Sequence, residues 1–340
     1  MFLFHLPLSY PGAYDYLAKD GEVAVQFFFV LSGFLITYLI LSEKQRAGRL
    51  NFKRFFARRA FRIWPLYYLM VAFAFFSPLI LSLLKLEHSD AGYTPNLLCS
   101  LFFLENYMTI ITRQAPNVSP LGVMWSVCVE EHFYLLWGLA LYFIDARRVP
   151  KLILFCLLIA PLSRIVFLAF NYRTLDLLTN IDLFALGAIP AYLLVQRPND
   201  FATRVNGLHS SVKFCYVAAV LTISLIAPHV NGFAASVFAP LVLGILFAGV
   251  LALFVPLHST FGISDNSVLT KLGMYTYGLY LFHTIVINCL SRVLARVGYS
   301  TESPLNGVCF AALALSASIA LAVLSYRFVE KPFLNLKRYA

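Results

Sequence analysis

Arg58, Arg59 and Arg62 stand close together near the start of a long apolar run, in the stretch KRFFARRAFRIWP. Arg59 and Arg62 are three residues apart, so they share a helical face if the helix has begun by then, and Arg58 lies beside them. Guanidinium groups at this spacing can grip phosphates through paired hydrogen bonds. Basic residues that flank a membrane helix are also ordinary topology signals, so both interpretations stay open. Pro65 is expected in the first turn of the span that follows.

Acidic and aromatic side chains open a second apolar run, in MWSVCVEEHFYLLW. Trp125 and Tyr134 fit an aromatic belt at the membrane interface, and acids in a first helical turn complement the helix dipole. Glu130 and Glu131, however, lie a turn or more into the run, where exposure to lipid is costly. We therefore expect at least one of the two carboxylates to face a polar cavity.

A third run carries Tyr277, Tyr280 and His283 at intervals of three, on one helical face. Such a stripe is more often a hydrogen-bond ladder between helices than a row of catalytic groups. Glu330, at the end of the last apolar run, is expected to pair with a basic neighbour.

Membrane-spanning helices must position these side chains. Of the 340 residues, 60% are hydrophobic and 12% are charged, and the mean hydropathy is +0.78, far above that of a soluble globular chain. A span needs about 20 apolar residues. Nine runs of this kind are found at 22–42, 63–84, 124–144, 151–170, 177–195, 212–228, 233–255, 272–290 and 305–329. The sequence predicts an all-α polytopic membrane bundle, with the shorter run 98–112 as an interfacial or re-entrant segment.

The distribution of Lys and Arg orients these helices, because positive residues in short loops stay in the cytoplasm. The connector at 43–62 holds eight basic residues against one acid and should be cytoplasmic. The C-terminal tail, with Lys337 and Arg338, should be cytoplasmic too, whereas the loop at 85–120 should be outside. Only the loop at 291–304 goes against the rule.

The same orientation creates a conflict at the start of the chain. The span at 22–42 must run from outside to inside, so the chain has to reach the outside before Ala13, and MFLFHL is too short to cross. We expect either a first helix reduced to a remnant or a chain that begins outside.

Several other chemistries find no support in the residues. The six cysteines are scattered with no CxxC pair, so they are interpreted as packing residues, and no metal site is predicted. The net charge of +10 is explained by cytoplasmic loops, so nucleic acid is not an expected partner. Ser32 and Gly33 form a small-residue step that is best explained by close helix packing.

Six stretches, taken in order, resemble the acyltransferase-3 family of membrane O-acyltransferases: VQFFFVLSGFLIT, FARRAFRIWPLYYL, MWSVCVEEHFYLLW, NIDLFALGA, LGMYTYGLYLFH and SYRFVEKPF. The resemblance covers nearly the whole chain and implies one domain over 1–340, a ten-helix bundle in the bacterial cytoplasmic membrane. It implies transfer of an acyl group, commonly acetyl, from cytoplasmic acyl-CoA to a hydroxyl of a saccharide or lipid-linked glycan. Acyl-CoA would be a co-substrate, and no tightly bound cofactor is expected.

The resemblance also assigns roles. Arg59 and Arg62 match the family's Arg-x-x-Arg pair, proposed to hold the acyl donor, and Arg58 stands beside them. His5 fits the position of the family's first-helix histidine, which would take a proton from the acceptor hydroxyl and return one to the departing thiolate. Glu130 would orient His5 or the acceptor. The expected substrate contacts are Trp125, Ser126, Tyr134, Tyr280 and His283.

One departure keeps other functions open. The arginine that stands eleven residues before the family's histidine would lie before Met1, so a chain of the same fold that is impaired in catalysis or not an enzyme is one alternative. A transporter or flippase is another, although paired halves with broken helices are not seen. His5 could instead be a surface residue on a frayed tail, and Glu130 a structural partner of Arg164 or Arg173.

Overall fold

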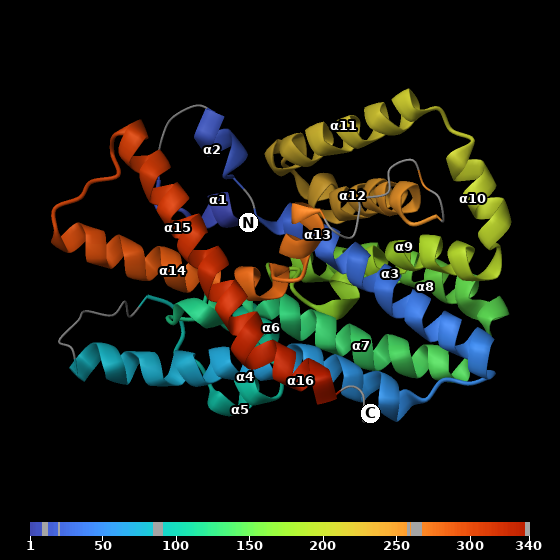
Figure 1. Ribbon diagram of the computed structural model, residues 1–340, viewed down its shortest axis with the longest axis horizontal. Coiled ribbons are helices and arrows are strands. Elements are labelled where there is room, and N and C mark those ends of the chain that lie inside the picture. The colour runs from blue at the N-terminus through green and yellow to red at the C-terminus, as the bar shows by residue number, and fades with distance from the viewer. Residues whose placement is uncertain (9–12, 20, 84–90, 257–258, 260–266, 337–340) are drawn as a thin grey trace. The chain divides into compact units, whose positions relative to one another are not determined.

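Regular structure is helical throughout the part of the chain that the structure describes. The computed structural model describes residues 1–8, 13–19, 21–83, 91–256, 259 and 267–336 (Figure 1). Within these ranges, eight helices are long and apolar enough to cross a membrane. Hydrocarbon offers no partners to backbone polar groups, so each crossing has to satisfy them internally, as a helix does. The predicted all-α polytopic architecture is confirmed.

The eight candidate spans coincide with eight of the nine predicted runs. The ninth, at 124–144, is the continuous helix α7 (Trp125–Phe143), which carries Glu130 and Glu131 in its first half. The run at 98–112 forms two short helices, α5 (Leu97–Leu101) and α6 (Glu105–Thr112). Residues 84–90 of the loop predicted to be outside, and the tail at 337–340, lie outside the described residues.

Residues 22–55 and 129–263 form one compact unit, called the second unit below. It contains most of α7 together with α3 (Glu22–Ala47), α8 (Val149–Ala169), α9 (Leu177–Gln196), α10 (Pro198–Asn206), α11 (Ser210–Ile226) and α12 (Phe233–Phe254). Short 3-10 turns at Ala146–Arg148 and Ala227–His229 precede α8 and follow α11. α9 is the most buried of its candidate spans, and α3, α8 and α12 pack around it.

α3 and α9 approach each other closely because a glycine stands on each helix at their crossing. A Cβ added to Gly33 would lie 2.0 Å from the carbonyl oxygen of Phe184, and one added to Gly187 would lie 1.8 Å from that of Val30. Small residues are what allow two helix backbones to come this near. The packing interpretation of the Ser32-Gly33 step is confirmed.

Gly33→Ala is expected to destabilise the protein, because the added methyl group would meet backbone that cannot turn aside. Overpacking of this kind costs about 1–3 kcal/mol, which should lower the Tm of the detergent-solubilised protein. Gly273→Ala is the matched control, since a Cβ added there meets nothing within 4 Å. Equal melting temperatures for the two variants would contradict the close crossing.

A buried ion pair joins α8 to α9. Arg164 Nη2 donates to Asp182 Oδ1 at 2.5 Å, and both side chains are buried almost completely. The same guanidinium donates to the carbonyl oxygens of Thr179 at 2.7 Å and Val237 at 3.0 Å, which ties α12 to the pair. Buried charges need such partners. Arg164 is therefore engaged with Asp182, and the alternative that paired it with Glu130 is wrong.

Residues 1–21, 56–128 and 264–340 form the other compact unit, called the first unit. It contains most of α4 (Phe52–Leu83) with α5 and α6, and also α1 (Phe2–His5), α2 (Ala13–Leu17), the 3-10 turn η1 (Ser119–Val123), α13 (Val268–Gly273), α14 (Thr276–Arg296), α15 (Pro304–Ser325) and α16 (Lys331–Leu336). α14 and α15 pack along each other. Leu6, directly after α1, shares a core cluster with Ile287 of α14 and Phe310 of α15, which anchors the start of the chain.

α4 begins earlier than predicted. Its first residue is Phe52, so Pro65 lies in the helix interior, and the first-turn prediction for Pro65 is wrong. The reason is local, because Asn51 accepts the backbone N–H of Arg54 through Oδ1 at 3.0 Å and so starts the helix well before the apolar run. The early start places Arg59 and Arg62 inside a helix, on one face.

Candidate functional site

Two tyrosines of α14 form the hydrogen-bond ladder that the spacing predicted. The Tyr277 hydroxyl donates to the carbonyl oxygen of Ile63 in α4 at 3.1 Å. The Tyr280 hydroxyl donates to the carbonyl oxygen of Val123 at 2.9 Å and lies 2.8 Å from the hydroxyl of Ser126. The ladder fastens α14 to two other segments of the first unit, so the prediction is confirmed for Tyr277 and Tyr280, whereas the His283 ring bonds to a carbonyl of its own helix.

His283, one turn further along α14, meets the imidazole of His5. The two ring centroids are 5.1 Å apart, with 59° between the ring planes. His283 is 2% exposed, and its Nδ1 lies 2.6 Å from the carbonyl oxygen of Tyr280. A carbonyl only accepts, so Nδ1 carries the hydrogen, and in the neutral ring Nε2 keeps its lone pair. Within the described residues that buried Nε2 has no hydrogen-bond partner.

His5 is held in place and half-buried. It ends α1, which lies outside the eight candidate spans, and its ring also packs edge-on against Phe4 at 4.9 Å. Burial lowers the pKa of His5 to about 4, with a smaller contribution from the amino-terminal charge. The ring is therefore neutral at pH 7, in the form that accepts a proton. The interpretation of His5 as a surface residue on a frayed tail is wrong.

The three arginines lie on the first unit's part of α4. Arg58 and Arg59 are half-buried, and Arg62 is exposed. Arg62 is near enough to Glu330 to attract its carboxylate, and Glu330 is 4% exposed. Gly278 of α14 leaves room for that carboxylate, since an added Cβ would lie 3.5 Å from Glu330 Oε1. The basic neighbour predicted for Glu330 is thus Arg62.

The ladder connects the arginine-bearing helix to the two histidines. Ile63, which accepts from Tyr277, directly follows Arg62 in the chain. From Tyr277 to His283, α14 rises by six residues, or about 9 Å. We call the three residues Tyr277, Tyr280 and His283 the polar column. It starts beside the backbone of Arg62 and ends at His5.

Two predicted site residues belong to the second unit. The Tyr134 hydroxyl donates to Glu130 Oε2 at 2.5 Å and lies 3.3 Å from the hydroxyl of Ser32. This cluster joins α7 to α3 and gives the Glu130 carboxylate a hydroxyl partner, whereas the polar cavity expected at Glu130 or Glu131 stays a prediction. The catalytic role of Glu130 and the substrate contacts of Tyr134 and of Trp125, at the start of α7, stay predictions.

The first unit contains a buried carboxylate that no motif in the sequence predicted. Glu105 is fully buried, accepts from the Tyr93 hydroxyl at 2.6 Å and accepts also from the Ser100 hydroxyl. The carbonyl oxygen of Ser100 in turn accepts from Tyr67 of α4 at 2.7 Å. The one signal was an acid within the short apolar run 98–112. Its hydrogen bonds assign Glu105 to holding α4, α5 and α6 together.

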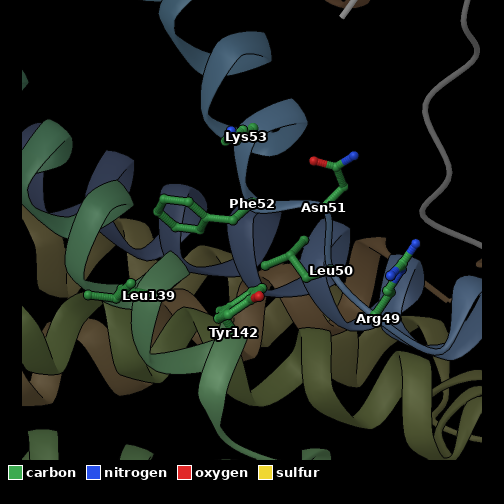
Figure 2. A pocket seen from close by; sticks show the side chains of 7 residues that line it. All are labelled: Arg49, Leu50, Asn51, Phe52, Lys53, Leu139 and Tyr142. Carbon is green, nitrogen blue, oxygen red and sulfur yellow. The ribbon is translucent and has the colours of Figure 1, made fainter.

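A cavity of about 430 Å³ opens in the second unit, where α3 connects to α4. Figure 2 shows the side chains that line it, which are Arg49, Leu50, Asn51, Phe52, Lys53, Leu139 and Tyr142. Two of these residues, Arg49 and Lys53, lie in the connector at 43–62 that the charge distribution predicted to be cytoplasmic, and the α7 residues that complete the cavity are far away along the chain.

The fold and the site together define an integral membrane protein in which the half-buried His5 packs against the buried His283. Residues 1–327 match the family described as "Acyltransferase domain". The chain therefore belongs to the acyltransferase-3 family, as its ordered motifs predicted.

Three relatives illustrate the match. The peptidoglycan O-acetyltransferase OatA of Listeria monocytogenes is 27% identical over 356 residues, covering 97% of this chain and 53% of that relative. YrhL of Bacillus subtilis, with the provisional name of peptidoglycan O-acetyltransferase, is 27% identical over 93% of this chain and 51% of its own length. A Staphylococcus aureus protein provisionally named an O-acetyltransferase is 26% identical over 92% of this chain and 52% of its own length. The chain spans about half the length of these curated relatives. No solved structure matches it.

Proposed function

We propose that this chain is a membrane O-acetyltransferase that moves acetyl from cytoplasmic acetyl-CoA to a hydroxyl of a saccharide. The observation that carries the proposal is the contact between His5 and the buried His283, at the end of a polar column that begins beside Arg62. The names of the relatives support a cell-wall glycan, of the peptidoglycan class, as acceptor. The domain extends over residues 1–340, in a bacterial cytoplasmic membrane with the C-terminus inside.

The chemistry requires one group that can take and return a proton. His5, neutral at pH 7, takes the proton of the acceptor hydroxyl while the hydroxyl oxygen attacks the thioester carbonyl carbon. The carbon–sulfur bond then breaks, and the CoA thiolate leaves with the proton that His5 held. The products are the acetyl ester and CoA, and His5 is neutral again.

The donor is held at the other end of the column. CoA carries several phosphate charges, and Arg59 and Arg62 present two guanidinium groups on one helical face, with Arg58 beside them. The buried carboxylate of Glu330 lies near enough to Arg62 to attract it. In this proposal acetyl-CoA is a co-substrate that leaves after each turnover. Glu130 and Tyr134 remain candidates for contacts to the acceptor.

His283 acts as a positioning residue. Its Nε2 lone pair faces no protein donor among the described residues and can accept a hydrogen bond from His5 or from the acceptor hydroxyl. His283→Phe should lower kcat about 10- to 100-fold and leave the KM for acetyl-CoA unchanged, whereas His283→Gln, which can still accept, should recover part of the rate. A raised KM with kcat intact, or equal rates for the two variants, would contradict this role.

The proposed function is tested by expressing the chain in a bacterium that does not O-acetylate its cell wall. Ester-linked acetate released from purified glycan by mild base is measured by mass spectrometry, and we expect it only when the chain is present. A membrane-inserted chain that adds no ester to any surface glycan would contradict the proposal.

A further inference from the structure

The cavity between α3, α4 and α7 has an apolar floor. Leu50 is buried, and the rings of Phe52 and Tyr142 meet edge to face with centroids 6.2 Å apart. Gly138, one turn before Tyr142 on α7, leaves room for Phe52 and Phe55, because an added Cβ would lie 3.3 Å and 3.0 Å from their rings. Figure 2 shows Leu50, Phe52 and Tyr142 gathered around the hollow, all within the second unit.

Hydrogen bonds hold the walls of this cavity in place. Lys44 Nζ donates to the carbonyl oxygens of Leu141 at 2.8 Å and Ile144 at 2.7 Å, which ties the end of α3 to the end of α7. The Asn51 N–H donates to Glu43 Oε1 at 3.0 Å. The connector between α3 and α4 is therefore fixed on both sides of the cavity.

The rim of the cavity is cationic. Arg49 and Lys53 are both exposed, so their charged ends are available to a ligand. The nearby carboxylate of Glu43 already accepts the Asn51 amide. An anionic group, and a phosphate above all, suits this rim.

The α7 wall of the cavity belongs to an apolar surface. Leu139 is 41% exposed, Tyr142 47% and Phe143 75%. A helix of a membrane protein that exposes such side chains presents them to lipid. A ligand of this cavity therefore meets cations at one end and hydrocarbon-facing side chains at the other, so it has to be amphipathic.

We propose that this cavity binds an anionic phospholipid, with its phosphate between Arg49 and Lys53 and an acyl chain along Leu139 and Tyr142. Basic pockets at the cytoplasmic ends of membrane helices are suited to anionic headgroups. This site is independent of the acetyl-transfer chemistry. Free acetyl-CoA also carries phosphates, but its pantetheine arm contains two amide groups and suits the exposed apolar face of α7 less well than a hydrocarbon chain does.

The proposal is tested on the full chain in nanodiscs that contain phosphatidylglycerol and phosphatidylethanolamine, with bound lipid counted by native mass spectrometry. We expect the protein to retain phosphatidylglycerol in preference to phosphatidylethanolamine. The double variant Arg49→Gln with Lys53→Gln should weaken that retention about thirtyfold, from the usual attraction of two basic residues to an anionic surface. Tyr142→Ala should weaken it with both charges present.

The matched control is Arg147→Gln with Arg148→Gln, which removes two exposed cations from another connector of the same unit and should leave retention unchanged. Equal retention of the two lipids, or an equal loss in the control, would overturn the proposal and leave the cations as topology signals. Displacement of phosphatidylglycerol by micromolar acetyl-CoA would overturn it in favour of a nucleotide site.

Discussion

Replacing His5 with alanine is expected to abolish acetyl transfer while the protein still inserts into the membrane and folds. In the proposed mechanism the imidazole holds the proton between the acceptor hydroxyl and the CoA thiolate, and general acid–base catalysis is worth about 10²- to 10⁴-fold in rate. Transfer is measured as label from acetyl-CoA that becomes bound to glycan in membranes. Insertion is checked by the amount and the melting temperature of the purified variant.

His229→Ala is the control for this experiment, because His229 lies in a 3-10 turn of the second unit and has no role in the proposed reaction.

The pH dependence gives a second check. Since burial lowers the pKa of His5 to about 4, the ring keeps its basic form on acidification, and the wild-type rate should fall only as the pH approaches 4 and not near the ordinary value of 6.5. Unchanged transfer by His5→Ala would remove His5 from the mechanism.

Replacing Arg59 and Arg62 together with alanine is expected to raise the KM for acetyl-CoA at least about tenfold, whereas the single Arg59→Lys and Arg62→Lys changes should have smaller effects. Lysine keeps the charge but loses the planar fork that binds a phosphate through two hydrogen bonds. The measurement is the acetyl-CoA dependence of the transfer rate, supported by direct binding of labelled acetyl-CoA to the purified protein.

Arg147→Ala with Arg148→Ala provides the comparison, since it removes the same charge from a connector outside the proposed donor site. If the alanine pair and the lysine changes had equal effects, or if the comparison pair raised KM as much, the arginines of α4 would have a topology role only.

Most of the fold could be predicted from the sequence, because each span is a local property of the chain. An apolar run of sufficient length must become a helix in hydrocarbon wherever its neighbours lie. The prediction failed at Pro65, because hydropathy shows where a helix enters the membrane and not where the helix starts. A polar cap starts α4 before the apolar run, so Pro65 lies in the helix interior. The pairing of Arg164 with Asp182 could not be predicted either, since it depends on how α8 and α9 pack.

The candidate site was predicted less completely, for the same reason. The spacing of Tyr277, Tyr280 and His283 showed a shared face and a ladder, but the chain gives no local sign that His5, far away in sequence, would lie against His283. Likewise, the cations at Arg49 and Lys53 become the rim of a cavity only when α7 supplies its aromatic wall. Contacts between distant segments are set by packing, and periodicity does not report them.

The proposed path from Arg59 and Arg62 to His5 is tested most directly in sealed membrane vesicles, by measuring from which membrane face acetyl-CoA supports transfer. Labelled acetyl-CoA is supplied to one face at a time, and glycan-bound label is counted for the wild type and for His5→Ala. We predict label on the glycan when acetyl-CoA meets the face of the 43–62 connector, and none with His5→Ala. Label that arrives equally from the opposite face, or that persists without the imidazole, would contradict a donor held by the arginines and an acetyl group delivered at His5.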